Sequence, residues 1–365
     1  MNLVDASLDY VRSISPYQPG KPISELAREM GLAEGSIVKL ASNENPLGMS
    51  PRARDAAISS IASVERYPDG NGFSLKAALS ARLGVAPEQI VLGNGSNDVL
   101  DLAARAFLSA GRSAVYAQYA FAVYPLATHA VGARGIEVPA REFGHDLDAM
   151  LAAVSADTRV VFIANPNNPT GTFVPGAQIE AFLERVPADV LVVLDEAYTE
   201  YLLPEQAYDS IAWLDRFPNL LVSRTFSKAY GLAGLRIGYG VGSKELIGLL
   251  NRVRQPFNVT SVGLAAACAA LDDLEFLARS AHINRRGMEK ITAALDELGL
   301  DWIPSAGNFV TFRVGDGAAV NNALLRQGVI VRPIAGYGLP EWLRVSIGLP
   351  EDNARFIGAL KVALA

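Results

Sequence analysis

The sequence contains little of what metal sites and disulfides require. Its 365 residues include a single cysteine, Cys268, which has no partner for an internal disulfide and is typical of a protein in a reducing compartment. The three histidines, His129, His145 and His282, show no ligand spacing with one another or with Cys268. We therefore expect no zinc site.

Charged residues and long apolar runs are also scarce. Only 19% of the residues are charged and the net charge is -6, which does not fit the basic surface of a nucleic-acid-binding protein. No run approaches the ~18 apolar residues of a membrane span, and the first residues, MNLVDASLDYVRS, lack the basic-then-apolar pattern of a signal peptide. We expect a cytoplasmic protein with neither a nucleic-acid nor a membrane partner.

Apolar strands and helical segments alternate through the middle of the chain. The strands are apolar throughout, which is typical of a parallel sheet covered on both faces by helices. We predict them at residues 90–92, near 114, and at 160–164, 190–194, 220–222 and 237–241. Beyond Asn251, alanine- and leucine-rich helices precede short strands (FVTFRV, VIVRP and LRVSIG) and a closing helix from Glu351, which predicts a second, α+β domain.

Three prolines shape the N-terminal segment. Pro16, Pro19 and Pro22 prevent a continuous helix until Ser24, which we expect to be the N-cap of a helix. The length of the chain favours about two domains. We therefore predict an N-terminal arm over residues 1–40, packed on the small domain or on a partner, a large domain over residues 41–250 and a small domain over residues 251–365.

Polar groups follow the predicted strands, where the ligands of a parallel sheet bind. After residues 90–92, Ser96 and Asn97 begin a helix in GNGSND. The free N–H groups of this helix could receive a phosphate, although a short glycine motif by itself more often marks a simple turn and N-cap. In NPNNPTG (residues 165–171), two prolines fix the backbone and direct Asn168 to the space above the sheet.

The motif DEAY follows the next buried strand. Asp195 stands at the end of that strand, where a carboxylate either has a cationic partner or caps the next helix. Tyr198 comes one helical turn later and can share the site with Asp195. Both side chains are therefore expected at the same edge of the sheet as Asn168.

A lysine follows the strand at residues 220–222. Among the seven lysines of the chain, Lys228 alone follows a buried strand, whereas Lys244 opens a helix and is expected to be solvated. Thr225 and Ser227 flank Lys228, and a glycine-rich connection leads to Arg236. A lysine that acts as a nucleophile needs a lowered pKa, which a desolvated strand end beside Arg236 would supply.

Together these groups suit pyridoxal 5'-phosphate. Lys228 would anchor the cofactor covalently, and Asp195 would keep its pyridine nitrogen protonated. Asn168 and Tyr198 would donate to its phenolate oxygen. Phe121, in YAFAVYP, could lie flat on the ring, although core packing explains this residue as well. The phosphate would be held by Ser96, Asn97, Thr225, Ser227 and Arg236.

These residues resemble the motifs of the fold type I aminotransferases. The family motifs NPxNPTG, DEAY and SK, the last followed by arginine eight residues later, match residues 165–171, residues 195–198, and Ser227, Lys228 and Arg236. More narrowly, PYQPGKP (16–22), KLASNENPLG (39–48) and RYPDGNGFSLKAAL (66–79) are similar to the histidinol-phosphate aminotransferases. The resemblance implies an α/β fold with a mostly parallel seven-stranded sheet sandwiched by helices, plus a smaller α+β domain.

The resemblance also implies roles for residues outside the main sheet. The family forms homodimers, in which Tyr67 would reach the cofactor phosphate of the neighbouring subunit; by itself, Tyr67 could be a loop-packing aromatic. Arg344 would clamp the α-carboxylate of the amino donor, and Arg332 with Tyr17 would hold the phosphate of the substrate. Asn45, in KLASNENPLG, would also bind the substrate.

The implied activity is transamination between glutamate and imidazole acetol phosphate, in histidine biosynthesis. YAFAVYP departs from the family pattern, which leaves open whether Phe121 or Tyr119 stacks on the cofactor. The alternatives on the same scaffold are an aromatic amino acid aminotransferase and a phosphoamino acid decarboxylase. A nucleotide-dependent oxidoreductase would need GxGxxG and a DNA-binding regulator a basic helical pair, and the sequence has neither.

Overall fold

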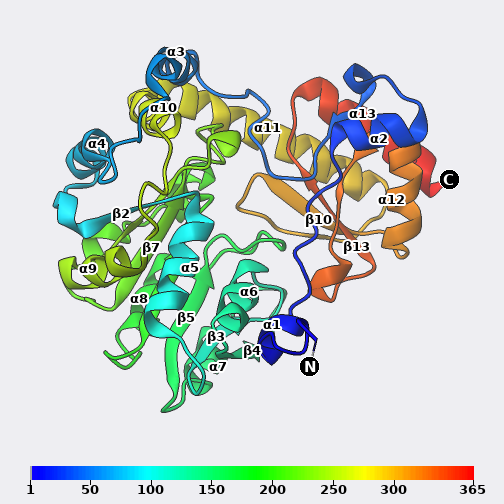
Figure 1. Cartoon of the computed structure of the whole chain (residues 1–365). Coiled ribbons are helices and arrows are strands. Elements are labelled where there is room, and N and C mark those ends of the chain that lie inside the picture. The colour runs from blue at the N-terminus through cyan, green and yellow to red at the C-terminus, as the bar shows by residue number, and fades with distance from the viewer. Residues whose placement is uncertain (1) are drawn as a thin grey trace.

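The larger domain is built on a seven-stranded sheet with the order β2-β8-β7-β6-β5-β3-β4. A computed structural model describes residues 2–365 (Figure 1). All neighbouring strands of this sheet are parallel except β8, which runs antiparallel to both β2 and β7. In chain order the strands are β2 (Ile90–Gly93), β3 (Ser113–Ala117), β4 (Arg134–Val138), β5 (Thr158–Ala164), β6 (Leu191–Asp195), β7 (Leu220–Thr225) and β8 (Gly238–Val241).

The sheet confirms the expected α/β fold, with two differences from the sequence prediction. We had counted residues 237–241 among the parallel strands, but the connection from β7 to β8 contains only a short 3-10 turn, Ala233–Leu235, and no helix that could cross the sheet. Strand β4 was not predicted. It lies at the edge of the sheet and is partly exposed, so it lacks the continuous apolar run that marks the buried strands.

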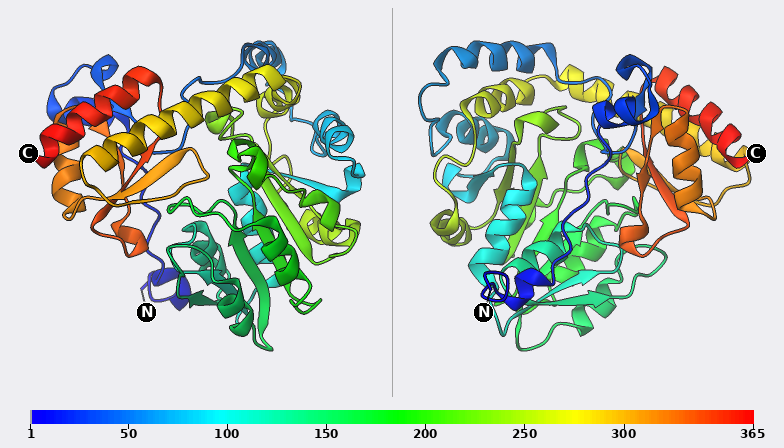
Figure 2. Two further views of the ribbon diagram at one scale, coloured as in Figure 1. Left: turned by 180° about the vertical axis from the view of Figure 1, so that it is seen from behind. Right: turned by 45° about the vertical axis from the view of Figure 1, so that its right-hand side comes forward.

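Helices cover both faces of this sheet. Helix α5 packs across β2, β7 and β8, and the two opposite views show α5 on one face and α8 on the other (Figures 1 and 2). Side chains at the ends of the parallel strands lie level, because Asp195 in β6 is paired with Ala164 in β5 and with Ser223 in β7. The helices of this domain are α3 (Pro51–Ser60), α4 (Phe73–Leu83), α5 (Ser96–Phe107), α6 (Val123–Ala130), α7 (Leu147–Ala152), α8 (Gly176–Leu183), α9 (Lys244–Val253) and α10 (Ser261–Leu271).

The smaller domain contains a four-stranded antiparallel sheet with the order β12-β13-β10-β9. Its core joins side chains of this sheet, such as Phe312 and Val345, to Ile291 and Phe356 on the covering helices. Its elements are α11 (Leu274–Glu297), β9 (Trp302–Ile303), β10 (Phe309–Arg313), α12 (Gly317–Arg326), β11 (Val329–Ile330), β12 (Arg332–Pro333), β13 (Trp342–Ser346) and α13 (Pro350–Leu364).

The larger core extends past residue 250, where we placed the end of the large domain. It runs from Ala53 to Leu271, because α10 packs against α3 and α4. The long helix α11 then crosses between the two domains: it contacts Thr199–Tyr201 in one and β10 and α13 in the other (Figure 1).

The N-terminal arm contains α1 (Asp9–Arg12), α2 (Ile23–Met30) and β1 (Val38–Lys39). Strand β1 pairs with β11 in parallel, and Leu26 of α2 packs with Leu325 and Ile330 of the smaller domain. The prediction that Ser24 caps α2 was wrong, because extended Pro22 is the N-cap and Ser24 already lies in the first turn. None of the helices within residues 2–365 is both long and apolar enough to cross a bilayer.

Candidate functional site

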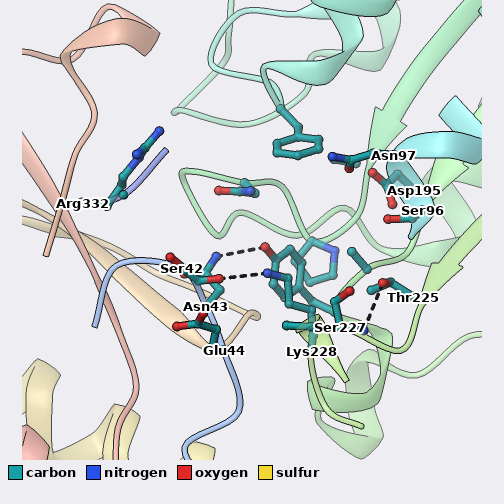
Figure 3. A pocket seen from close by; sticks show the side chains of 18 of the residues that line it. Ser42, Asn43, Glu44, Ser96, Asn97, Asp195, Thr225, Ser227, Lys228 and Arg332 are labelled. Carbon is teal, nitrogen blue, oxygen red and sulfur yellow. Dashed lines mark hydrogen bonds between the residues drawn. The ribbon is translucent and has the colours of Figure 1, made fainter. Parts of the chain in front are cut away.

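A cavity of about 260 Å³ lies at the carboxyl ends of β5, β6 and β7, facing the smaller domain. Figure 3 shows Lys228 and Thr225 on the side of the main sheet and Arg332 on the opposite side. Many of the side chains that we singled out in the sequence line this cavity: Tyr17, Ser96, Asn97, Phe121, Asn168, Asp195, Tyr198, Thr225, Ser227, Lys228, Arg236, Arg332 and Arg344.

Lys228 projects into the cavity from the turn after β7. Its side-chain nitrogen Nζ donates to the backbone oxygen of Ser42 at 3.0 Å (Figure 3). Burial lowers the pKa of Lys228 to about 7, and the positive charge of Arg344 adds to this effect more than that of Arg236 does. The lowered pKa of Lys228 therefore comes chiefly from desolvation. Among the nearby positive charges, Arg344 lowers it more than Arg236, which we had expected to have the larger effect.

Asp195 ends β6 on the floor of the cavity. The hydroxyl of Tyr124 donates to Oδ2 of Asp195 at 3.0 Å, whereas Oδ1 is buried and has no hydrogen-bond partner among the described residues. Burial raises the pKa of Asp195 to about 6. Among residues 2–365 no cation pairs with this carboxylate, and its free Oδ1 could accept a hydrogen bond from a cationic group of a ligand.

Several hydrogen-bond donors and a positive charge lie around the N-terminus of α5. Ser96 opens this helix, and Arg236 lies so close that a Cβ atom on Gly95 would be 2.3 Å from its Nη2. Arg236 also donates through Nη1 to the hydroxyl of Ser227 at 3.3 Å. Backbone N–H groups of a helix N-terminus, a hydroxyl and a guanidinium that lie together in this way could bind a phosphate.

Two amide side chains reach the cavity beside Tyr198. Asn43 donates through Nδ2 to the hydroxyl oxygen of Tyr198 at 2.9 Å. Oδ1 of Asn168 accepts from Arg344, which leaves the NH₂ group of Asn168 to donate to a ligand. Burial raises the pKa of Tyr198 to about 12, so its hydroxyl keeps its proton at neutral pH.

Two arginines enter the cavity from the smaller domain. Arg332 in β12 and Arg344 in β13 are directly paired across the antiparallel ladder, which places their side chains on the same face of the sheet. Arg344 is buried, donates to the backbone oxygen of Ala41 at 2.7 Å and keeps its Nε without a partner among residues 2–365. Arg332 donates to the backbone oxygen of Gln18 at 2.6 Å and lies 5.4 Å from the ring centroid of Tyr17.

Three further predicted residues do not line the cavity. Asn45 is buried and donates to the backbone oxygen of Ala229 at 2.7 Å and to Ser280 at 2.8 Å. Tyr67 is 83% exposed and stacks on Phe257 with ring centroids 4.7 Å apart. Of the two rings left open for stacking on a cofactor, Phe121 lines the cavity and Tyr119 does not.

Sequence reasoning missed three residues of the site. Ser42 and Asn43 stand in KLASNENPLG, from which we had singled out Asn45 alone, and they contact Lys228 and Tyr198 from the segment that follows β1. Tyr124 stands in YAFAVYP, three residues after Phe121. That spacing, one turn of helix, was a usable signal that both side chains could reach the same site.

The residues 35–360 match the family model described as aminotransferase class I and II. The chain belongs to the aminotransferase class I and II family. This finding and the relatives below confirm the resemblance and the expected fold.

The chain is 66% identical to histidinol-phosphate aminotransferase 1 of Cupriavidus pinatubonensis over 98% of this chain and 96% of that protein. It is 64% identical to histidinol-phosphate aminotransferase 1 of Dechloromonas aromatica over the full length of both. Among solved structures, it is similar to the histidinol-phosphate aminotransferase of Sinorhizobium meliloti in complex with pyridoxal-5'-phosphate, with a TM-score of 0.90, 30% identity, and coverage of 98% of this chain and 97% of the other.

Proposed function

We propose that this member of the family is a pyridoxal phosphate-dependent enzyme that transfers an amino group between glutamate and imidazole acetol phosphate, giving L-histidinol phosphate and 2-oxoglutarate. The names of the full-length relatives support this substrate pair and do not favour an aromatic amino acid aminotransferase. The observation that carries the proposal is that the amine of Lys228, the unpartnered Oδ1 of Asp195 and two arginines converge on one cavity.

The residues of the cavity fit pyridoxal phosphate. The unpartnered Oδ1 of Asp195 would accept from a protonated pyridine nitrogen, and Tyr124 holds the other oxygen of the carboxylate in place. Phe121 would stack on the ring. The phosphate would be held by Ser96, Asn97, Thr225, Ser227 and Arg236.

Lys228 supplies the amine at the centre of the proposed reaction. When bound, pyridoxal phosphate offers a carbonyl that links to an amine and a ring that accepts the electron pair left on a substrate carbon. A pKa of about 7 leaves much of Lys228 uncharged at neutral pH, so its nitrogen is nucleophilic. As a free amine, Lys228 would be placed to act as the general base that takes a proton from Cα of the substrate and then as the general acid that returns it.

Tyr198 and Asn168 would hold the cofactor ring through its phenolate oxygen. The hydroxyl of Tyr198 would donate a hydrogen bond to that oxygen, and the NH₂ group of Asn168 would donate a second one. Arg344 fixes the orientation of Asn168 through Oδ1. These contacts would stabilise negative charge on the phenolate oxygen of the bound cofactor.

The arginines of the smaller domain would select the substrate. Arg344, with a buried and unpartnered Nε, would clamp the α-carboxylate of glutamate. Arg332 and Tyr17 would hold the phosphate of histidinol phosphate, which reaches the cavity on the side of the arm. Asn45 lies outside the cavity, so it would contribute to substrate binding indirectly, by donating to the backbone oxygen of Ala229, the residue after Lys228.

We also propose that two copies form a homodimer in which Tyr67 reaches the cofactor phosphate of the other subunit. Its exposed ring, stacked on Phe257, supports this arrangement, because the stack fixes the ring while most of the side chain stays accessible. Apolar side chains that a partner could cover lie exposed in nearby elements: Ile58, Ile61, Val64 and Phe73. We place the reaction in the cytoplasm, in keeping with the free thiol of Cys268.

A panel of amino donors tests the proposed activity. Purified protein loaded with pyridoxal phosphate would be given histidinol phosphate, phenylalanine and tyrosine, and kcat/KM would be measured for each with 2-oxoglutarate as acceptor. The proposal expects histidinol phosphate to rank first. A higher value for phenylalanine or tyrosine would instead establish the aromatic aminotransferase.

A further inference from the structure

Asn43 is a buried residue that connects the smaller domain to Tyr198. Its backbone N–H donates to the hydroxyl of Ser346 in β13 at 2.8 Å, and its backbone oxygen accepts from Asn308, just before β10, at 3.0 Å. Its φ of +54° is a left-handed conformation that asparagine tolerates better than most residues. Contacts from β13 and from the residue before β10 therefore fix the backbone of Asn43, whose side chain lies beside the Tyr198 hydroxyl.

The hydrogen bonds around Ser346 determine which way the side-chain amide of Asn43 points. The hydroxyl of Ser346 accepts from the backbone N–H of Asn43 and donates to its Oδ1 at 2.9 Å. If the amide were turned round, its NH₂ group would face Ser346 and the hydroxyl proton of Ser346 would lose this acceptor inside the protein. Leaving a buried polar group unpaired is costly, so Nδ2 faces Tyr198.

This orientation decides what Tyr198 can do with its own proton. The phenol oxygen accepts from Nδ2 of Asn43 at 2.9 Å, so the hydroxyl proton cannot point at that amide nitrogen. The titratable and charged groups around Tyr198 are Lys228, whose Nζ lies 5.8 Å from the ring centroid, and Asp195, Arg344, Tyr124, Tyr201 and Tyr337. The hydroxyl proton is left for an acceptor inside the cavity.

We propose that Asn43 is a positioning residue that makes Tyr198 a hydrogen-bond donor to the phenolate oxygen of bound pyridoxal phosphate, and that Ser346 sets the direction of this relay from the smaller domain. The inference rests on the proposed function, because it requires the cofactor. Asn43 itself touches no reacting atom; it acts through Tyr198.

The direct test reverses the direction of this hydrogen bond. Asn43→Asp keeps the shape of the side chain but replaces the donor by an acceptor, which would draw the Tyr198 proton away from the cavity. The absorbance of bound pyridoxal phosphate would be titrated against pH in the holoenzyme. Losing the donor to the phenolate should raise the midpoint of this titration by about one pH unit, the size of one hydrogen bond to a charged group.

A matched pair of variants separates the effect of the Asn43–Tyr198 hydrogen bond from the effect of the negative charge that Asn43→Asp introduces. In a Tyr198→Phe background the hydroxyl is absent, so Asn43→Asp should shift the midpoint much less than it does in the parent protein. Equal shifts in both backgrounds, or no shift in the parent, would overturn the inference. Both of these outcomes are measured on proteins that show the absorbance of bound cofactor. If the parent protein itself bound no pyridoxal phosphate, the proposed function would be refuted instead.

If Asn43→Asp does not fold, Ser346→Ala tests the same inference. This variant removes the acceptor and donor that orient the Asn43 amide while leaving Tyr198 and Lys228 in place. The midpoint should rise in the same direction by a smaller amount, and it should not rise in the Tyr198→Phe background. A midpoint equal to that of the parent protein would contradict the relay.

Discussion

The Nζ of Lys228 donates to the backbone oxygen of Ser42 at 3.0 Å, although the two residues are separated by 186 positions in the chain. The amine is thus held by a neutral acceptor in a buried site, and burial lowers its pKa to about 7. An uncharged amine, rather than an ammonium ion paired with a carboxylate, is the state that covalent chemistry at Lys228 needs.

Replacing Lys228 by alanine should abolish turnover while leaving a site that binds pyridoxal phosphate without a covalent link. The loss of the amine that moves the proton should reduce kcat by about 10,000-fold or more, since it removes both general-base and covalent catalysis. Steady-state kinetics and the absorbance of bound cofactor would measure the two effects. Lys244→Ala, at an exposed position on α9, is the matched control and should keep full activity; comparable losses in both variants would refute the role of Lys228.

Asp195 should make the cofactor-free protein less stable as the pH rises. Its pKa is about 6 in the folded protein and 3.8 in the unfolded reference, so between these values the folded state binds more protons. This contribution to stability is fully present below pH 3.8 and is lost as the pH rises through about 6. The difference corresponds to about 3 kcal/mol.

Asp195→Asn removes this titration and keeps an acceptor for Tyr124. The cofactor-free variant should therefore gain stability over the parent as the pH rises from about 4 to about 6, and keep that gain above it. Urea unfolding at pH 4.5 and pH 7.5 would measure the difference. The same variant should bind pyridoxal phosphate more weakly, and an equal or smaller gain at the higher pH would show that the carboxylate is not destabilised by burial.

Arg332→Ala should affect a phosphate-bearing donor more than one without phosphate. Losing a charged contact to the phosphate should lower kcat/KM for histidinol phosphate by about 100-fold, with a much smaller change for glutamate. Arg326→Ala, exposed on α12, is the control and should change neither value. If both donors lost activity equally through Arg332→Ala, this side chain would have no part in recognising phosphate.

Tyr67→Phe should weaken cofactor binding although Tyr67 lies outside the cavity of its own chain. The loss of one hydroxyl contact to the phosphate should raise the Kd for pyridoxal phosphate by about tenfold. Sedimentation should give twice the mass of the chain for both proteins, because the hydroxyl does not build the interface. A monomer with full cofactor affinity would contradict the proposed dimer.

The sequence revealed the buried elements of the site better than the exposed or distant ones. Strands β5, β6 and β7 each contain a continuous apolar run, and Asn168, Asp195 and Lys228 come after these runs, so their position at one sheet edge followed from the parallel pattern. Strand β4 has no such run because it is an edge strand, and the direction of β8 depended on the path of a loop that has no periodicity.

Contacts between distant segments were beyond the reach of the pattern. Ser42 and Asn43 contact Lys228 and Tyr198 because the segment that follows β1 passes from the smaller domain to the cavity, and no local spacing in the sequence encodes that path. A cationic partner, one of the two alternatives that the sequence left open for Asp195, is not found among residues 2–365, where the Tyr124 hydroxyl donates to one carboxylate oxygen and the other has no hydrogen-bond partner.

The covalent role of Lys228 can be measured directly. The holoenzyme would be treated with borohydride, which fixes pyridoxal phosphate to the lysine that carries it, and then digested and examined by mass spectrometry. The account predicts a mass increase on the peptide that contains Lys228 and on no other lysine-containing peptide. A label on another lysine, or no label on a protein that shows bound cofactor, would contradict it.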